Sequence, residues 1–540
     1  MQLTHVLQQL SQTIESLARQ EQWAEGFVCE FTPTKDKAHG DYATNAAMIL
    51  SKAAKKNPRD LATQLQAVIQ QLDLPIHHVD IAGPGFLNVT FDKQAFVSVI
   101  PEILSAANYG AGATKDTSIL VEYVSANPTG TLHIGHARGG AYGDSLSRIL
   151  TKAGYRVHKE FYVNDGGQQI INLAKSIYAR YQELLGHPVA IPEDGYHGQE
   201  IIEAARDIQQ EHGNNLTEAD LPLFQELGVH LMLSRLESDL TRYRVPFDQW
   251  FREQTLYPAQ VEAVITALQA TGHTYEADGA LWLKTSEHGD EKDRVMKTSD
   301  GRYTYFVPDT AYHKTKFDRG YDTLINVWGA DHHGTIPRLK ASLHLLGYPS
   351  DQLHIELLQM VKVYQNGEEV KMSKRSGNAI GLLDLIDEVG VDPIRYFFAA
   401  RALSTPMDLD LDLALRKTNE NPVYYAQYAH ARIHSLFAKA ERSVTPVTTF
   451  QHLPATAHPL LMLLSEYPMV IDEAASKRIP HRLTQYIQSL ASAFHQYYND
   501  QPIVTDNLTA TNEQLNLMQA IASVLKDALS LIGVSAPERM

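Results

Sequence analysis

The pattern of apolar and polar residues divides the chain into three segments. In the first, residues 1–117, apolar residues recur every three or four positions and predict an amphipathic helix. These residues are Leu3, Val6, Leu7, Leu10, Ile14 and Leu17. A second helix is expected over 43–56, because the proline at 58 disfavours helical geometry in the residue before it. A Gly/Pro turn then leads into an expected strand over 86–91, so this segment should be a small α/β domain.

The middle segment, residues 118–410, alternates strand and helix patterns. The expected strands are 118–124, 156–163, 322–329 and 354–364. A helix is expected over 336–346, and alternation of this kind is typical of a parallel α/β sheet. Between about 186 and 290 the pattern is more helical and polar, which we interpret as an insertion between two halves of the sheet.

The last segment, residues 411–540, has few strand signals. Its clearest feature is an apolar stripe at helical spacing. The stripe consists of Leu515, Met518, Ala522, Leu525, Leu529 and Ile532. We therefore expect an all-α bundle.

Composition narrows the class of protein. The chain has 540 residues, 44% of them hydrophobic and 20% charged, which suits several folded domains. The single cysteine, Cys29, excludes a disulfide framework and favours the cytoplasm. No apolar run approaches the roughly 18 residues that span a bilayer, so we expect no membrane association. The net charge of −16 argues against indiscriminate binding to polyphosphate, but a locally basic surface can still bind nucleic acid.

Two short motifs carry the chemistry. The first, HIGH at 133–136, follows the strand at 118–124 and begins a helix. Its His133 and His136 flank Gly135, which lets a ligand approach the backbone closely, and a helix N-terminus favours anions. Two imidazoles at this point can cradle a triphosphate. The alternative is that one histidine caps the turn and the other packs against it.

The second motif, KMSK, contains Lys371, Met372, Ser373 and Lys374. It lies in a glycine-bracketed loop that can bring two ammonium groups onto phosphates, although such a loop can also be a solvated surface segment. Together, HIGH and KMSK in this order resemble the signature motifs of class I aminoacyl-tRNA synthetases. The resemblance implies a Rossmann-type catalytic domain that binds ATP between the two motifs.

Further stretches resemble the arginyl-tRNA synthetases specifically. They are VEYVSANPTGTLHIGHARGG (121–140), FYVNDGGQQ (161–169), DGRYTYFVPDTAYH (300–313), NVWGADHHG (326–334) and NENPVYYAQYAHARI (419–433). The resemblance implies an arginine–tRNA ligase that uses ATP with Mg²⁺, L-arginine and the tRNA for arginine. It also implies an N-terminal domain (1–117) that contacts tRNA, a catalytic domain (118–410) and a helical anticodon-binding domain (411–540). We expect a monomer.

The resemblance also implies roles for individual residues. His133, His136, Lys371 and Lys374 would be catalytic, and ATP would contact both motifs, including Gly135, Met372 and Ser373. In the arginine pocket, Tyr305 and Asp309 would hold the guanidinium, whereas Glu122, Ser125 and Asn127 would meet the α-amino and carboxylate groups. A guanidinium presents five donors in a planar fork, which suits this acidic and aromatic set. Asp309 as a helix cap and Glu122 in a structural ion pair remain alternatives.

Asp331, His332 and His333 can be interpreted as ATP or arginine contacts, as structural hydrogen-bonding groups, or as metal ligands. We favour the first interpretation and assign no residue to a metal, since no other Cys/His group has zinc-like spacing.

The RNA-facing residues are less distinctive. Lys52, Lys55 and Lys56 can contact RNA or stabilise a helix C-terminus, and Tyr424, Tyr425 and Tyr428 can stack on bases or pack in a core.

Two other functions also remain open: a class I synthetase for another amino acid, and a non-catalytic RNA-binding protein on a synthetase scaffold.

Overall fold

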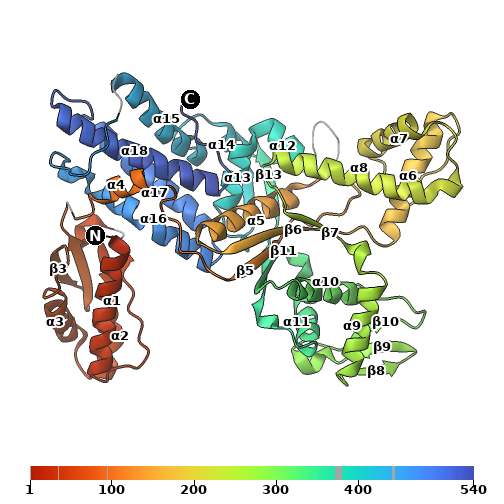
Figure 1. The fold of residues 1–540 in the computed structure, drawn as a ribbon, viewed down its shortest axis with the longest axis horizontal. Helices are drawn as coiled ribbons and strands as arrows, with labels where there is room; N and C mark the ends of the chain where they lie inside the picture. Colours follow the sequence, from red (N-terminus) through yellow and green to blue (C-terminus); the bar gives the residue numbers. More distant parts are fainter. Residues whose placement is uncertain (1, 35, 94, 371–379, 441–443) are drawn as a thin grey trace.

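The computed structural model describes all but a few short stretches of the chain (Figure 1). The described residues are 2–34, 36–93, 95–370, 380–440 and 444–540. A parallel sheet lies at the centre of the fold. The N-terminal unit and the C-terminal helices lie to one side of it, and two lobes extend from the other. None of the helices in the described part of the chain has the length and apolarity needed to cross a lipid bilayer.

The N-terminal unit is an antiparallel sheet with the strand order β1-β2-β4-β3, packed against helices. Its elements are α1 (Leu3–Gln20), β1 (Thr32–Pro33), β2 (Tyr42–Thr44), α2 (Ala46–Ala54), α3 (Pro58–Ile69), β3 (Ile76–Ala82) and β4 (Phe86–Phe91). The next helix, α4 (Val99–Ser105), packs against the C-terminal helices instead (Figure 1). The apolar stripe of α1 is buried from Leu3 to Ile14, as its spacing predicts, whereas Leu17 is half-buried. The second helix is shorter than the expected 43–56, because residues up to Thr44 belong to β2.

Five parallel strands form the central sheet in the order β12-β11-β5-β6-β7. They are β5 (Ser118–Glu122), β6 (Arg156–Val163), β7 (Gln249–Arg252), β11 (Thr323–Gly329) and β12 (Leu353–Leu358). Its neighbouring helices include α5 (Ile134–Lys152), α10 (Phe306–Asp318) and α11 (Ile336–Leu345). The chain adds β6 and β7 on one side of β5, then β11 and β12 on the other. The strand order therefore reverses between β5 and β11, which is where ligands bind in open α/β sheets.

Two lobes occupy most of the range 186–290 and extend beyond both of its ends. The first consists of α6 (Gln168–Leu184), α7 (Gln199–His212) and α8 (Leu221–Arg242), which share a core of their own. The second contains α9 (Ala259–Ala270) and an antiparallel sheet of β8 (Thr274–Ala277), β9 (Ala280–Leu283) and β10 (Arg294–Lys297). The same range also contains β7, which pairs with β6. The segment expected as an insertion thus contributes a strand to the central sheet, and four residues are too few to show in the apolar pattern.

The run expected as one strand over 354–364 forms two strands. Its first half is β12, whereas its second half is β13 (Val361–Gln365), which pairs with β14 (Glu368–Glu369) and β15 (Met407–Asp410) in a separate small sheet. Short 3₁₀ helices occur at η1 (Lys37–His39), η2 (Glu218–Asp220), η3 (Glu253–Leu256), η4 (Thr285–His288), η5 (Ala330–Thr335), η6 (Ser350–Gln352) and η7 (Ala455–Ala457).

Helices make up most of the remaining chain. They are α12 (Leu382–Val389), α13 (Val391–Ala399), α14 (Leu411–Leu415), α15 (Pro422–Ala440), α16 (His458–Ser476), α17 (His481–Asp500) and α18 (Leu508–Leu531). The last four lie together (Figure 1), and the stripe that begins at Leu515 is buried on α18. The predicted fold class, a parallel α/β domain with a smaller N-terminal α/β unit and a C-terminal helical bundle, is confirmed.

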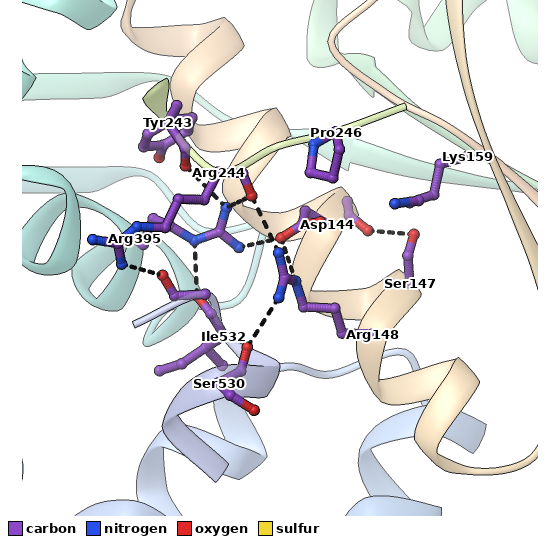
Figure 2. A network of polar contacts seen from close by, with 12 residues as sticks. Asp144, Ser147, Arg148, Lys159, Tyr243, Arg244, Pro246, Arg395, Ser530 and Ile532 are labelled. Carbon is purple, nitrogen blue, oxygen red and sulfur yellow. Dashed lines mark hydrogen bonds and ion pairs between the residues drawn. The ribbon is translucent and has the colours of Figure 1, made fainter. Parts of the chain in front are cut away.

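A buried ion-pair network joins α5 to the bundle (Figure 2). Asp144 on α5 accepts hydrogen bonds from Arg395 Nη2 at 2.5 Å and from Arg148 Nε at 2.7 Å. Arg395 on α13 is fully buried and also donates to the carbonyl of Ile532, just beyond α18, at 2.9 Å. Arg148 donates to the carbonyl of Ser530 at 3.3 Å. These contacts fix the helix that begins with the HIGH motif against the C-terminal bundle.

Candidate active site at the switch point of the parallel sheet

The turn after β5 is strained. Val124 and Ser125 have φ angles of 67° and 46°, in the left-handed region that non-glycine residues rarely adopt. The Ser125 hydroxyl donates to Glu122 Oε1 at 3.0 Å and accepts from the backbone N–H of Tyr162 at 3.2 Å, which stabilises the turn. Asn127 follows as an exposed residue. The turn therefore brings Ser125 and the end of β5 together at the switch point.

The two histidines of the HIGH motif cap helix α5 reciprocally. His133 is the N-cap residue, and its Nδ1 accepts hydrogen bonds from the N–H groups of Gly135 at 3.0 Å and His136 at 3.4 Å. In return, Nδ1 of His136 accepts from the N–H of His133 at 3.2 Å. The two rings stack with centroids 3.6 Å apart. Both histidines therefore cap the turn and pack, which are the structural roles left open above.

This arrangement fixes the protonation of both rings. Burial, followed by the neighbouring His133, lowers the pKa of His136 to about 3, and partial desolvation lowers the pKa of His133. Both imidazoles are therefore neutral near pH 7. Because each Nδ1 accepts a backbone hydrogen bond, each ring carries its proton on Nε2. The turn thus offers two imidazole N–H donors in addition to the N-terminal end of the helix dipole.

The KMSK residues Lys371, Met372, Ser373 and Lys374 lie outside the described residues. The chain is described again from Ile380, and there it meets the HIGH turn directly. Gly381 forms an isolated β-bridge with His133, and the N–H of Leu382 donates to the carbonyl of Leu132 at 2.7 Å. The segment that follows KMSK in the sequence therefore lies against the HIGH turn.

A buried polar chain runs from β5 to α10. Lys316 Nζ lies 2.5 Å from Glu122 Oε2, and the two side chains are 0% and 6% exposed. Lys316 also donates to Asn326 Oδ1 at 3.1 Å, and the Asn326 amide lies 2.6 Å from His313 Nε2. Glu122 therefore has the structural ion pair that its sequence context left open, and its second oxygen accepts from Ser125.

The start of α10 presents the two residues predicted to hold a guanidinium. Tyr305, at the N-cap position, is 91% exposed. Asp309 lies inside the first turn, so it is not the helix cap that was considered as an alternative. Its Oδ1 lies 3.1 Å from Nδ1 of the buried His313. With its side chain 34% exposed, Asp309 remains accessible to a ligand.

Glu253 is a candidate site residue that the sequence did not reveal. It is 7% exposed, and its Oε1 accepts a hydrogen bond from the Tyr257 hydroxyl at 3.2 Å. Burial raises its pKa, and the negative charges of Asp165 and Asp309 raise it further, although hydrogen bonds from tyrosines partly oppose this. Asp165 has its own cation, since Arg252 Nε lies 2.5 Å from its carboxylate. Among the described residues, no cationic side chain forms an ion pair with Glu253, although the negative charge of Asp309 acts on it.

Residues 331–333 follow β11 at the same switch point. Asp331, His332 and His333 are all exposed on η5. His332 Nε2 lies 3.7 Å from Asp331 Oδ2. In the described part of the chain these three residues do not gather as a set of metal ligands. Their position suits a contact with a ligand at the switch point, which stays a prediction.

Comparison with known proteins identifies the family. Three family models match consecutive parts of the chain: an arginyl tRNA synthetase N terminal domain at 4–91, a tRNA synthetases class I (R) catalytic domain at 99–393, and a DALR anticodon binding domain at 426–540. The arginine–tRNA ligase of Bacillus subtilis is 48% identical over 518 residues, which are 94% of this chain and 93% of that protein. The chain belongs to the arginyl-tRNA synthetase family.

Other members of the family agree with this assignment. Arginine–tRNA ligase 1 of Halalkalibacterium halodurans is also 48% identical, again over 94% of this chain and 93% of that protein. The structure of the Thermus thermophilus arginyl-tRNA synthetase has the same fold, with a TM-score of 0.78 over 99% of this chain and 100% of that chain, at 22% identity. The resemblance inferred from the sequence motifs is confirmed.

The C-terminal bundle of this synthetase carries an aromatic surface. On α15, the rings of Tyr424 and Tyr428 stack with centroids 5.9 Å apart, and Tyr428 stacks on His495 of α17 at 5.6 Å. The guanidinium of Arg432 lies 4.1 Å from the ring centroid of Tyr498. Tyr428 is 36% exposed, so part of this surface is open to a stacking base.

The lysines near the end of α2 have local partners. Lys56 Nζ lies 5.3 Å from the centroid of the Trp23 ring and 2.6 Å from Gln64 Oε1. Lys55 is the C-cap residue of α2. The C-cap position of Lys55 fits the structural role considered for this cluster, and contact with RNA stays a prediction.

Proposed function

We propose that this chain is an arginine–tRNA ligase, which activates L-arginine with ATP and transfers it to the tRNA for arginine. Family membership supports the reaction. The observation that carries the choice of amino acid is the acidic pair of Glu253 and Asp309. Glu253 is buried and has no ion-pair partner among the described residues, and Asp309, whose charge raises the pKa of Glu253, is partly exposed. A guanidinium compensates both charges and satisfies their hydrogen-bond acceptors at once.

The first step is adenylate formation. An oxygen of the arginine carboxylate attacks the α-phosphorus of ATP, the bond to the bridging oxygen breaks, and pyrophosphate leaves. The attacking group is already an anion, so no general base is needed, and catalysis consists of positioning and charge stabilisation. The Nε2–H groups of His133 and His136, the positive end of the α5 dipole near Gly135, and the ammonium groups of Lys371 and Lys374 supply that stabilisation.

ATP is held between the two motifs, with Met372 and Ser373 contributing from the KMSK segment. Mg²⁺ arrives with ATP and is bound mainly through phosphate oxygens and water, which is the coordination this ion prefers. Asp331, His332 and His333 contact ATP or arginine from the end of β11.

The arginine backbone groups are bound at the strained turn after β5. Ser125, Asn127 and Glu122 meet the α-carboxylate and α-amino groups. Because Glu122 is already paired with Lys316, its contribution is a hydrogen bond within a neutral pair. The guanidinium extends to Tyr305, Asp309 and Glu253.

In the second step the 2′-hydroxyl of the terminal tRNA adenosine attacks the arginyl carbonyl carbon, and AMP leaves. Residues 1–117 contact the body of the tRNA, residues 118–410 catalyse both steps, and residues 411–540 hold the anticodon, with bases stacking on the surface around Tyr428. The enzyme acts as a cytoplasmic monomer.

Aminoacylation of total tRNA with ATP and Mg²⁺, run separately with each of the twenty amino acids, tests the proposal. Arginine alone should be transferred. Charging by another amino acid would keep the class I reaction but discard the pocket at Glu253 and Asp309. The absence of charging by any amino acid would leave a non-catalytic RNA-binding protein on this fold.

A further inference from the structure

Two histidines and a glutamate meet on the second lobe, within the lobe that carries β8 to β10. His273 lies in the turn between α9 and β8, whereas Glu287 and His288 end the short helix η4. One ligand atom from each residue lies within 4.8 Å of the other two. Neither adenylate formation nor transfer to tRNA uses these residues. Tyr305, the proposed pocket residue nearest to them in the sequence, lies at the start of α10.

Two of the three distances between the ligand atoms match a shared metal ion, and the third, between Glu287 and His288, lies within 4.8 Å. His273 Nδ1 lies 3.4 Å from His288 Nε2 and 3.4 Å from Glu287 Oε2. Two nitrogen or oxygen ligands bound to one zinc ion at about 2.0–2.1 Å, at the tetrahedral angle, are about 3.4 Å apart. The two imidazole rings are also close to perpendicular, at 78°, with centroids 4.8 Å apart, so they can present their nitrogens to a common point.

Several hydrogen bonds hold η4, the segment that carries Glu287 and His288. Arg294 donates to both oxygens of the buried Asp290 at 2.7 and 2.8 Å, directly after η4. The Thr285 hydroxyl donates to the carbonyl of Lys292 at 2.8 Å, and the Ser286 hydroxyl donates to Asp293 Oδ1 at 2.6 Å. These bonds close η4 onto the strand that follows, so Glu287 and His288 are held in place before any ion binds.

The third ligand, His273, is held through its backbone. The N–H of Lys284 donates to the His273 carbonyl at 2.9 Å, which fixes the turn against β9. Lys284 Nζ also lies 3.7 Å from Glu287 Oε1, so Oε1 faces a cation while Oε2 faces His273. Imidazole and carboxylate together suit Zn²⁺ and neighbouring divalent transition metals.

We propose that His273, Glu287 and His288 form a site for a divalent transition metal of the zinc type, with water completing the coordination. The ion joins the α9–β8 turn to η4 and so stabilises this lobe. The alternative is a hydrogen bond between the two imidazoles with an ion pair to Glu287, which needs no metal. Only the metal site predicts that substitution of these residues weakens the binding of a divalent metal.

The test uses the full-length chain after treatment with a chelator. Zn²⁺ is titrated in competition with a chromophoric chelator, and Co²⁺ is titrated in parallel, because its visible absorption reports tetrahedral coordination. We expect wild type to bind one more equivalent of metal than His273→Gln or His288→Gln, or to bind it at least about tenfold more tightly. Added Zn²⁺ should raise the Tm of wild type more than that of either variant.

Glu287→Gln keeps the shape of the side chain while removing its charge, so it tests the third ligand with little risk to folding. His187→Gln, at an exposed position on the first lobe, and His344→Gln, whose ring centroid lies 5.7 Å from that of His288, are matched controls and should bind like wild type. Equal metal binding by wild type, His273→Gln and His288→Gln would overturn the proposal. So would a loss confined to His344→Gln. Circular dichroism establishes that each variant is folded.

Discussion

Nδ1 of His133 accepts hydrogen bonds from the backbone at His136, and Nδ1 of His136 accepts one from the backbone N–H of His133. Each histidine therefore caps the helix with one ring nitrogen and directs the other nitrogen, as an N–H donor, away from that cap. Stabilising the turn and binding phosphate are consequently functions of opposite edges of the same two rings, and substitution can separate them.

Substitution of His133 should separate capping from catalysis. Asparagine is a good N-cap residue but does not extend as far as the Nε2–H of histidine. We expect His133→Asn to keep the free energy of unfolding within about 0.5 kcal/mol of wild type while kcat falls about 100-fold or more. His133→Ala should lower both, with a loss of about 1 kcal/mol in stability. Urea unfolding and arginylation kinetics measure the two effects, and an unchanged kcat in His133→Asn would remove this ring from catalysis.

Acidification should reveal the lowered pKa of His136. In the folded protein this pKa is about 3, whereas an unfolded histidine titrates near 6.5. Between these values the unfolded state binds a proton that the folded state does not, so the stability present above pH 6.5 is lost as the pH falls toward 3. In His136→Asn the free energy of unfolding should fall less between pH 7 and pH 4 than in wild type. His197→Asn, at an exposed position, should follow the wild-type curve. Parallel curves for wild type and His136→Asn would contradict the lowered pKa.

The buried pair of Glu122 and Lys316 should behave as a unit. Lys316→Met leaves the Glu122 carboxylate buried without its cation, and removing one partner of a buried pair typically costs about 3–5 kcal/mol. The double variant Glu122→Gln/Lys316→Met should recover part of that loss, since no charge is then left buried. Lys314→Met on the same helix removes an exposed pair with Asp318 and should cost less than about 1 kcal/mol. Chemical denaturation of wild type, Lys316→Met, Glu122→Gln and the double variant measures the coupling, and additive effects would show that the two residues act independently.

Neutralising either carboxylate of the proposed guanidinium pocket should weaken arginine binding. We expect Glu253→Gln and Asp309→Asn each to raise the KM for arginine at least about tenfold, with little change in the KM for ATP, because the charge that pairs with the guanidinium is lost. Asp351→Asn, at an exposed position on η6, is the control. A normal KM in Glu253→Gln would place the guanidinium elsewhere.

Two glycines of α5 should respond differently to alanine. A Cβ at Gly143 would lie 2.2 Å from the Tyr123 ring, whereas a Cβ at Gly139 would meet its nearest neighbours at an ordinary 3.9 Å. Gly143→Ala must shift α5 or the fully buried Tyr123, so we expect a loss of about 1–3 kcal/mol in stability and lower kcat, since the same helix begins with HIGH. Gly139→Ala should be neutral or stabilising because alanine favours the helix. Thermal unfolding and arginylation distinguish them, and similar Tm values for the two variants would show that α5 tolerates the added methyl group at Gly143.

Local patterns in the sequence were sufficient for much of the fold. The strands that begin at Ser118 and Arg156 and the long helix α18 follow from apolar spacing, which depends on neighbouring residues alone. The pattern failed where an element was short or where one apolar run served two sheets. β7 is only Gln249–Arg252, and β12 and β13 are separated by just two residues.

The sequence by itself determined the family and the two motifs, because HIGH, KMSK and the stretches around them are contiguous and need no knowledge of the fold. Only the tertiary structure decided which distant residues meet. Glu122 pairs with a lysine 194 positions away, the charge of Asp309 acts on Glu253, and His273 faces His288 across a hairpin. Burial and charge balance depend on all the elements packed around a group, and they gave these residues roles that the linear pattern does not contain.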